Sequence, residues 1–501
     1  MKKIILFLNK YRPDLMVIFF LSLLVYKAWA TLLPLTIRSD GFASMLSSAQ
    51  KTFWQGSFPL ASFMLSEMIL DSILPKIFGV HLSLYYWFVV FTIIAIGIMF
   101  YLTMKIITKN RLVAFSAAII FSVSYFGVYD MVSTHCYCLF ANRVYPVLFL
   151  IPSFLFLHLF LERNKGKYFI VSTLLYFLAV GLGHFVLLIF PAFFLYPLFW
   201  KLFNEKIIRK KIEGFIYGLF YVLLTGFFYG IQQINESVLS PHKWTFMQFL
   251  LHPEKYSYLK KIALQYVYWS QYPLFFHELP INPMYYIVDF RVAPSYIPFT
   301  ILIYVIAALV VYKLLPKQRP MLFTLVFSIS IIFYFNAYIG QYDMLNFSGA
   351  SRYLYLPSIL LSIFWAYFLW AVFWRKKTIL VGGGIFLLAV YFVINVRLIS
   401  SNNIMAIEWD RSARTIFDYV ISSRPKLSSQ TLVVVTYPEF GSQEATFFTE
   451  QIGKGGVQYI SDNILVNAPD HTWEKVASSS SHVIKLSYDN DCRCVKDEKL
   501  K

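Results

Sequence analysis

Charged side chains are scarce in this sequence, and acidic ones are the scarcest. Asp, Glu, Lys and Arg together make up 14% of the 501 residues, and Asp and Glu account for only 26 of them. By contrast, 58% of the residues are hydrophobic, 20% are aromatic and the mean hydropathy is +0.61. A soluble protein of this length could not bury so much apolar surface. The composition therefore excludes a soluble protein and indicates a polytopic membrane protein.

Further absences disfavour other classes. The first long apolar segment is too long for a signal peptide and no small-x-small cleavage site follows it, so we predict that it remains a membrane span. The apolar segments carry no acidic residue at mid-membrane depth, where proton- and ion-coupled transporters usually place carboxylates. The sequence also lacks the internal repeats or broken, charged spans expected of a transporter or lipid flippase.

Apolar runs of about 17–25 residues, the length that crosses a hydrocarbon core, recur along residues 1–396. They predict about eleven transmembrane helices, at roughly 14–36, 82–104, 112–130, 145–161, 168–182, 184–202, 214–231, 296–312, 321–339, 353–374 and 378–396. The fifth and sixth are separated only by "GLGH", which we interpret as one tight turn.

Lys and Arg cluster before the first span and in every second connection between the spans. The clusters are Lys2, Lys3, Lys10 and Arg12; Lys105, Lys109 and Arg111; Arg163, Lys165 and Lys167; Lys201, Lys206, Arg209, Lys210 and Lys211; Lys313, Lys317 and Arg319; and Arg375, Lys376 and Lys377. Since cytoplasmic loops are enriched in these residues, we predict a cytoplasmic N-terminus and an extracytoplasmic C-terminus. The net charge of +18 is spread over these short clusters, so we predict no nucleic-acid partner.

The longer segments fall on the predicted outer face. Outer loops at 37–81 and 232–295 belong to a transmembrane module, 1–396, and a tail follows at 397–501. In the tail, "EWDRSARTIFDYVI" and "SQEATFFTEQI" have helical periodicity, whereas "TLVVVTY" and "VIKLSY" are typical of strands. We therefore predict a small extracytoplasmic α/β domain.

The four cysteines form two pairs on the predicted outer face, Cys136 with Cys138 and Cys492 with Cys494. In an oxidising compartment a disulfide between the loop near 131–144 and the tail is one prediction, and free thiols are the alternative. Two widely separated pairs are a weak zinc signal, so a metal site is less favoured.

The predicted spans are nearly free of ionisable side chains away from their ends. Lys27 is in the outer half of the first span, where it either extends to the interface or meets a lipid phosphate. His158 is predicted to be a hydrogen-bonded structural residue.

Asp40 comes where the chain leaves the first span, in "PLTIRSDGFASM". Apolar residues at helical spacing follow it, over 42–53 and again over 63–69, and predict helices in the membrane interface or ordinary loop helices packed on the tail. An N-cap role alone would explain an Asp at this position.

The wider context resembles a known family. The stretch "SDGFASMLSSAQKTFWQGSFPL" resembles the first outer loop of the GT-C superfamily, the integral membrane glycosyltransferases that use polyprenyl-phosphate-linked sugars. The matching positions are Asp40, Phe42, Ala43, Ala49, Gly56 and Pro59. "SGASRYLYLPSILL" looks like the Arg-Tyr segment that opens a late span in these enzymes, here Arg352, Tyr353 and Pro357. The resemblance covers most of residues 1–400.

The sequence departs from the family at one point. Members similar to protein O-mannosyltransferases and aminoarabinose transferases usually have Asp-Glu at the first site, whereas this chain has Asp40 and Gly41. A second acid could come from Asp130 at the outer end of the third span, for which a solvated span end is the alternative.

The resemblance implies a carboxylate base, Asp40, for the acceptor hydroxyl, and cations for the departing phosphate. Arginine suits phosphate because its fork matches the oxygens. The candidate donor ligands are Arg352, Tyr353, Arg143, Arg291 and Lys27. For Arg143 and Arg291 an interfacial arginine is the alternative. His184 at the "GLGH" turn is predicted either to contact phosphate or acceptor or to cap the turn.

The sequence thus favours a glycosyltransferase of the plasma (inner) membrane. It would move a sugar from a polyprenyl-phosphate donor to a glycan, lipid or protein on the outer face. The alternatives are an O-antigen-type polymerase or ligase, which would depend on Arg and His in the large loop, and a non-enzymatic lipid or sugar transporter. The sequence does not indicate a metal, and a divalent cation (Mg²⁺ or Mn²⁺) is left open.

Overall fold

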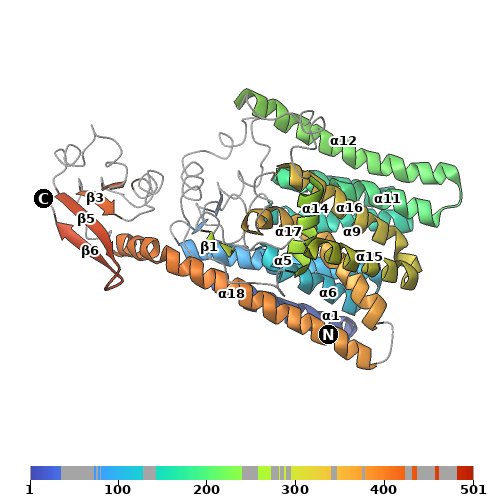
Figure 1. Cartoon of the computed structure of the whole chain (residues 1–501), viewed down its shortest axis with the longest axis horizontal. Helices are drawn as coiled ribbons and strands as arrows, with labels where there is room; N and C mark the ends of the chain where they lie inside the picture. The colour runs from blue at the N-terminus through green and yellow to red at the C-terminus, as the bar shows by residue number, and fades with distance from the viewer. Residues whose placement is uncertain are drawn as a thin grey trace.

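The computed structural model of the chain is a helical bundle from which one long helix leads to a small sheet (Figure 1). It describes residues 2–34, 73–74, 77–78, 81–127, 143–239, 258–271, 281–282, 287–288, 295–339, 347–374, 378–423, 431–436, 449, 457–461 and 482–499.

Each predicted apolar run coincides with a helix. The helices are α1 (Lys2–Trp29), α5 (Leu82–Thr108), α6 (Arg111–Ser122), α9 (Val147–Arg163), α10 (Gly166–Leu182), η4 (His184–Ile189) continuing into α11 (Phe190–Asn204), α12 (Ile208–Leu239), α15 (Tyr296–Leu314), α16 (Arg319–Ile339), α17 (Phe347–Leu369) extended by the π-helical turn η7 (Trp370–Trp374), and α18 (Thr378–Ser423). Gly183 alone separates α10 from η4, as the predicted tight turn requires.

Eight helices of the described chain are long and apolar enough to cross a membrane, which makes this a multi-pass membrane protein. The predicted count of about eleven spans is not confirmed. The three remaining helices are shorter, since α6 has 12 residues and α9 and α10 have 17 each. At a rise of about 1.5 Å per residue, α6 is roughly 18 Å long against a hydrocarbon core of about 30 Å.

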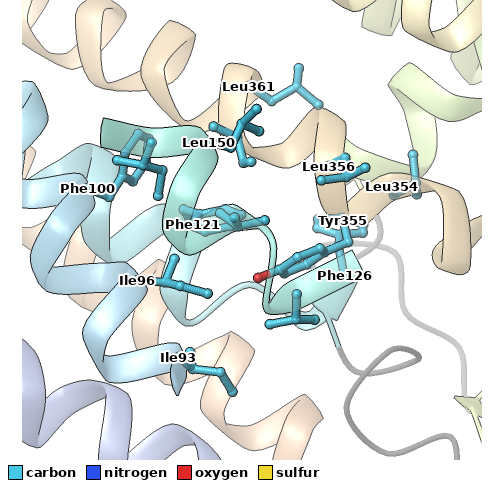
Figure 2. Close-up of a cluster of buried hydrophobic side chains, with 14 of the residues drawn as sticks. Ile93, Ile96, Phe100, Phe121, Phe126, Leu150, Leu354, Tyr355, Leu356 and Leu361 are labelled. Atoms are coloured by element: carbon cyan, nitrogen blue, oxygen red, sulfur yellow. The ribbon is translucent and has the colours of Figure 1, made fainter. Parts of the chain in front are cut away.

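The bundle core joins α6 to its neighbours through aromatic rings (Figure 2). The ring of Phe121 on α6 has its centroid 5.5 Å from that of Phe100 on α5 and 5.3 Å from that of Tyr355 on α17. Leu150 of α9 and Leu361 of α17 belong to the same buried cluster. Most residues of α6 are buried, so α6 is enclosed by the neighbouring helices.

Glycines allow α12 to lie against α11 at close range. A Cβ atom added at Gly218 would lie 2.4 Å from the carbonyl oxygen of Phe194, and one added at Gly214 would lie 2.6 Å from that of Pro197. This small-xxx-small spacing is a common way for membrane helices to approach closely.

The long helix α18 connects the bundle to the tail. It has 46 residues and passes through residue 396, where we expected the membrane module to end, without interruption. The predicted helix "EWDRSARTIFDYVI" is its last part. Hydrogen bonds of polar side chains join α18 to the bundle. The backbone N–H of Tyr125 donates to Oδ1 of Asn395 (3.0 Å), and the Tyr125 hydroxyl donates to Oδ1 of Asn402 (3.1 Å). Nδ2 of Asn403 donates to the hydroxyl oxygen of Thr31 (2.7 Å).

Among the described residues of the tail, four strands form a sheet: β3 (Thr431–Thr436), β4 (Gln458–Ser461), β5 (His482–Asp489) and β6 (Cys494–Lys499). Their order is β4-β3-β5-β6, with β3 parallel to β4 and β5 and with β6 antiparallel to β5. Both predicted strands, β3 and β5, are confirmed, whereas of the predicted helix at "SQEATFFTEQI" only Thr449 is among the described residues.

The end of α18 packs on this sheet. Its residues Phe417 and Val420 are buried, and the hydroxyl of Tyr419 donates a hydrogen bond of 2.6 Å to the carboxylate of Asp497 on β6. The helix α18 therefore packs against the bundle with its first part and against the tail sheet with its last part.

The predicted disulfide between an outer loop and the tail was wrong. Cys492 is bonded to Cys494, two residues away, across the turn that joins β5 to β6. Neither can therefore pair with Cys136 or Cys138, which lie outside the described residues.

Candidate functional site

The start of α17 lies at the end of the bundle that faces the tail sheet. α17 and α18 are consecutive helices separated by only residues 375–377, so α17 must begin at the end toward which α18 runs (Figure 1). Tyr353 lies in the second turn of α17.

Arg143 and Tyr353, both predicted to bind the donor phosphate, are brought together at this end. The guanidinium carbon of Arg143 lies 5.9 Å from the centroid of the Tyr353 ring. Arg143, only 5% exposed, lies in the short segment that leads into α9. An arginine at this distance from an aromatic ring is attracted by its π face. A buried cation is thus held in a defined place beside an aromatic ring.

Two buried amides support the start of α17. Asn336 of α16 donates from Nδ2 to the backbone carbonyl of Tyr353 (2.8 Å) and to Oε1 of Gln265 (3.2 Å). Gln265 donates in turn to the backbone carbonyl of Phe333 (2.8 Å). Both amide side chains are fully buried.

Gln265 belongs to α14 (Tyr258–Gln271), a helix of the predicted outer loop 232–295 that packs inside the bundle. The ring of Trp269 stacks between Phe126 (5.7 Å) and Trp365 of α17 (6.5 Å), and the hydroxyls of Tyr266 and Ser330 are 2.9 Å apart. This placement could not be predicted from the sequence, because Lys and Gln residues interrupt the apolar pattern of α14.

The remaining predicted site residues are only partly placed. Lys27 lies on the exposed side of α1, and the ring of its neighbour Tyr26 stacks on Trp87 at 6.0 Å. Arg352 directly precedes Tyr353 in α17 and His184 begins η4, but the side chains of both lie outside the described part of the structure.

Asp40, Asp130 and Arg291 lie outside the described residues altogether, as do the predicted interfacial helices of the first outer loop.

His158 has the structural role that we predicted. It is buried in α9, and its Nδ1 lies 2.7 Å from the hydroxyl oxygen of Tyr196 on α11.

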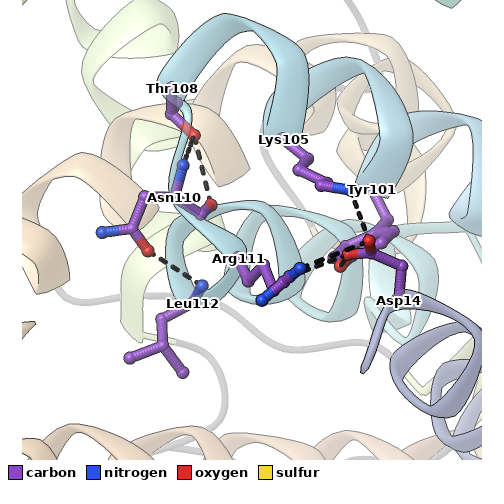
Figure 3. A network of polar contacts seen from close by, with 7 residues as sticks. All are labelled: Asp14, Tyr101, Lys105, Thr108, Asn110, Arg111 and Leu112. Carbon is purple, nitrogen blue, oxygen red and sulfur yellow. Dashed lines mark hydrogen bonds and ion pairs between the residues drawn. The ribbon is translucent and has the colours of Figure 1, made fainter. Parts of the chain in front are cut away.

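An ionic cluster around the buried carboxylate of Asp14, at the other end of the bundle, was not predicted (Figure 3). The carboxylate of Asp14 on α1 lies 2.6 Å from Lys105 Nζ and 2.9 Å from Arg111 Nε, and accepts a hydrogen bond from the Tyr101 hydroxyl (2.8 Å). It joins α1 to the basic turn between α5 and α6. An acidic residue at the head of the first span and a basic turn after the second were the only sequence signals.

A metal site does not emerge from the described residues, which contain no group of three or more His, Cys, Asp or Glu side chains that could hold an ion. Around Arg143 and Tyr353 the partners named above are aromatic rings, amides and backbone carbonyls.

Comparison with known proteins adds no relative. No protein-family model matches the chain, and no curated protein matches it either.

Proposed function

We propose that this protein is a GT-C-like membrane glycosyltransferase that moves a sugar from a polyprenyl-phosphate donor to an acceptor glycan, lipid or protein on the outer face of the membrane. The observation that supports it most is the contact between Arg143 and Tyr353. The sequence predicts both residues as phosphate ligands, and they are about 210 positions apart by their numbering. They meet at the end of the bundle that faces the tail sheet.

The orientation is part of the proposal. We infer that α6, α9 and α10 complete eleven spans, with the N-terminus in the cytoplasm and the tail outside the plasma membrane. The basic connections support this orientation by the positive-inside rule. Among them, the turn between α5 and α6 meets the end of α9 through the Lys109–Glu162 ion pair (3.0 Å), whereas Arg143 precedes the start of the same helix.

In the reaction we propose, the carboxylate of Asp40 removes the proton of an acceptor hydroxyl. The hydroxyl oxygen then attacks the anomeric carbon, the bond from that carbon to the phosphate oxygen breaks, and the electron pair leaves with the polyprenyl phosphate. Direct displacement inverts the anomeric configuration. Arg143 and Arg352 stabilise the departing phosphate, and Tyr353 orients Arg143. Asp130 and His184 remain candidates for the acceptor side, and no step requires a divalent cation.

The test is sugar transfer by the purified, detergent-solubilised protein from a panel of polyprenyl-phosphate hexoses and pentoses to a cell-envelope extract. Arg143→Ala and Arg352→Lys should each lower transfer about 100-fold or more, as expected when an electrostatic stabiliser of the transition state is lost. Arg163→Ala is the matched control, because Arg163 makes the same kind of contact with Tyr168 (5.8 Å) at the opposite end of α9.

Equal activity of the Arg143→Ala and Arg163→Ala variants would contradict the phosphate role of Arg143. A different outcome is that the wild-type protein transfers no sugar from any donor in this assay. If it then moves lipid or sugar across a vesicle membrane, the transporter alternative is favoured. A polymerase or ligase would instead depend on Arg and His residues of the large loop and not on Asp40.

A further inference from the structure

The helix α17 contains a proline just after the candidate donor residues. In an α-helix the carbonyl of residue i accepts from the N–H of residue i+4, so the carbonyl of Tyr353 would accept from residue 357. That residue is Pro357, which has no N–H. The Tyr353 carbonyl therefore lacks its helical donor, and burial without another would be costly.

Asn336 of the neighbouring helix α16 supplies the missing donor. Its Nδ2 lies 2.8 Å from the Tyr353 carbonyl oxygen. The orientation of this amide is determined by its contacts, because Nδ2 also faces an acceptor, Oε1 of Gln265, at 3.2 Å. The orientation of Gln265 is determined in the same way, because its Nε2 faces the carbonyl oxygen of Phe333 at 2.8 Å.

We propose that Gln265 and Asn336 are positioning residues for the donor site, and that they act by replacing the hydrogen bond that Pro357 removes from α17. Arg352 and Tyr353 lie in the turn just before this interruption, so the direction of that turn depends on the bond from Asn336. Gln265 holds Asn336 from α14, so the large outer loop takes part in placing the donor residues. The positioning role rests on the proposed glycosyl transfer, whereas the replacement of the hydrogen bond does not.

A double-mutant cycle of Asn336→Ala and Pro357→Ala tests this directly. Asn336→Ala alone should raise the KM for the polyprenyl-phosphate sugar about three- to tenfold. This is the change expected when donor binding loses the contribution of one buried hydrogen bond. In the Pro357→Ala background the helix N–H is restored, so the same substitution should change this KM less than about twofold. An equal effect in both backgrounds would overturn the proposal.

Asn402→Ala is the matched control, because Asn402 is also a buried, hydrogen-bonded asparagine but lies on α18. Its effect should be the same with and without Pro357→Ala. The KM for the acceptor should stay unchanged in the Asn336 variants, whereas a general loss of structure would alter both constants.

The melting temperature of the four proteins separates this proposal from the proposed function. One outcome is that the wild type transfers no sugar while Asn336→Ala still lowers the melting temperature more with Pro357 present than in the Pro357→Ala background. In that case Asn336 does replace the missing hydrogen bond, and the proposed enzyme function is wrong. If the wild type is active and neither the KM nor the melting temperature shows coupling, the replacement itself is wrong.

Discussion

The guanidinium carbon of Arg143 lies 5.9 Å from the ring centroid of Tyr353, and this contact joins the segment before α9 to the second turn of α17. Both residues are buried. Burying a cation costs free energy unless opposite charges or polarizable groups interact with it. The π face of the Tyr353 ring supplies part of this stabilisation for Arg143.

The ring of Tyr353 should therefore matter more than its hydroxyl. Tyr353→Phe keeps the π face and should transfer sugar at close to the wild-type rate, whereas Tyr353→Ala should lose about 2 kcal/mol of transition-state stabilisation, roughly 30-fold in kcat/KM. Tyr168→Ala, which removes the ring beside Arg163, is the control and should leave kcat/KM unchanged. Loss of activity in Tyr353→Phe would assign the role to the hydroxyl instead.

The Asp14 cluster should govern stability and not transfer. Asp14→Asn leaves Lys105 and Arg111 without their buried carboxylate and should cost about 1.5–3 kcal/mol, the usual worth of hydrogen bonds to a charged group. Glu162→Gln is the control, because its partner Lys109 is 76% exposed in its side chain and such pairs contribute about 0–1 kcal/mol. Equilibrium unfolding in mixed detergent measures both. Equal stability of the two variants would refute this account.

The joint between α18 and the sheet should weaken at alkaline pH. The hydrogen bond to Asp497 raises the pKa of Tyr419 from 10.0 to about 12. Because the folded state favours the protonated tyrosine, this stabilisation is complete below pH 10.0 and is lost as the pH rises toward about 12. The melting temperature of wild-type protein should fall more steeply over this interval than that of Tyr419→Phe. Identical slopes would show that the bond does not contribute.

Sequence reasoning located the helices and part of the sheet because those features are local. Each predicted span is an apolar run with Lys and Arg at one end. β3 is a run of mostly β-branched residues, and β5 alternates apolar and polar residues. The continuity of α18 was missed, since the hydropathy falls after residue 396 while the helical backbone continues to Ser423.

What could not be predicted depends on contacts between distant segments. Nothing near Asn336 in the sequence shows that it faces the carbonyl before Pro357, and nothing near Gln265 shows that α14 enters the bundle. The Arg143–Tyr353 contact could be anticipated only as two separate candidates, because their pairing is a property of the folded bundle.

The membrane orientation has a direct test. A reporter fused after Lys377 should be cytoplasmic, and one fused at Lys501 should be extracytoplasmic, because the basic N-terminal segment and five basic connections fall on one side by the sequence. The residues before α18 and the C-terminus would then lie on opposite sides, as the length of α18 allows. An extracytoplasmic signal after Lys377 would reverse the orientation and remove the donor site from the outer face.

The most direct test of the proposed chemistry is the rate of sugar transfer by purified Asp40→Asn protein, measured beside donor binding. Asn caps a helix about as well as Asp, so folding and donor binding should be preserved. If Asp40 is the general base, transfer should fall by about 10²–10⁴-fold with donor binding unchanged. Near-normal transfer by Asp40→Asn would mean that Asp40 only caps a helix, and would contradict the assignment of this protein as a glycosyltransferase that uses Asp40 as its base.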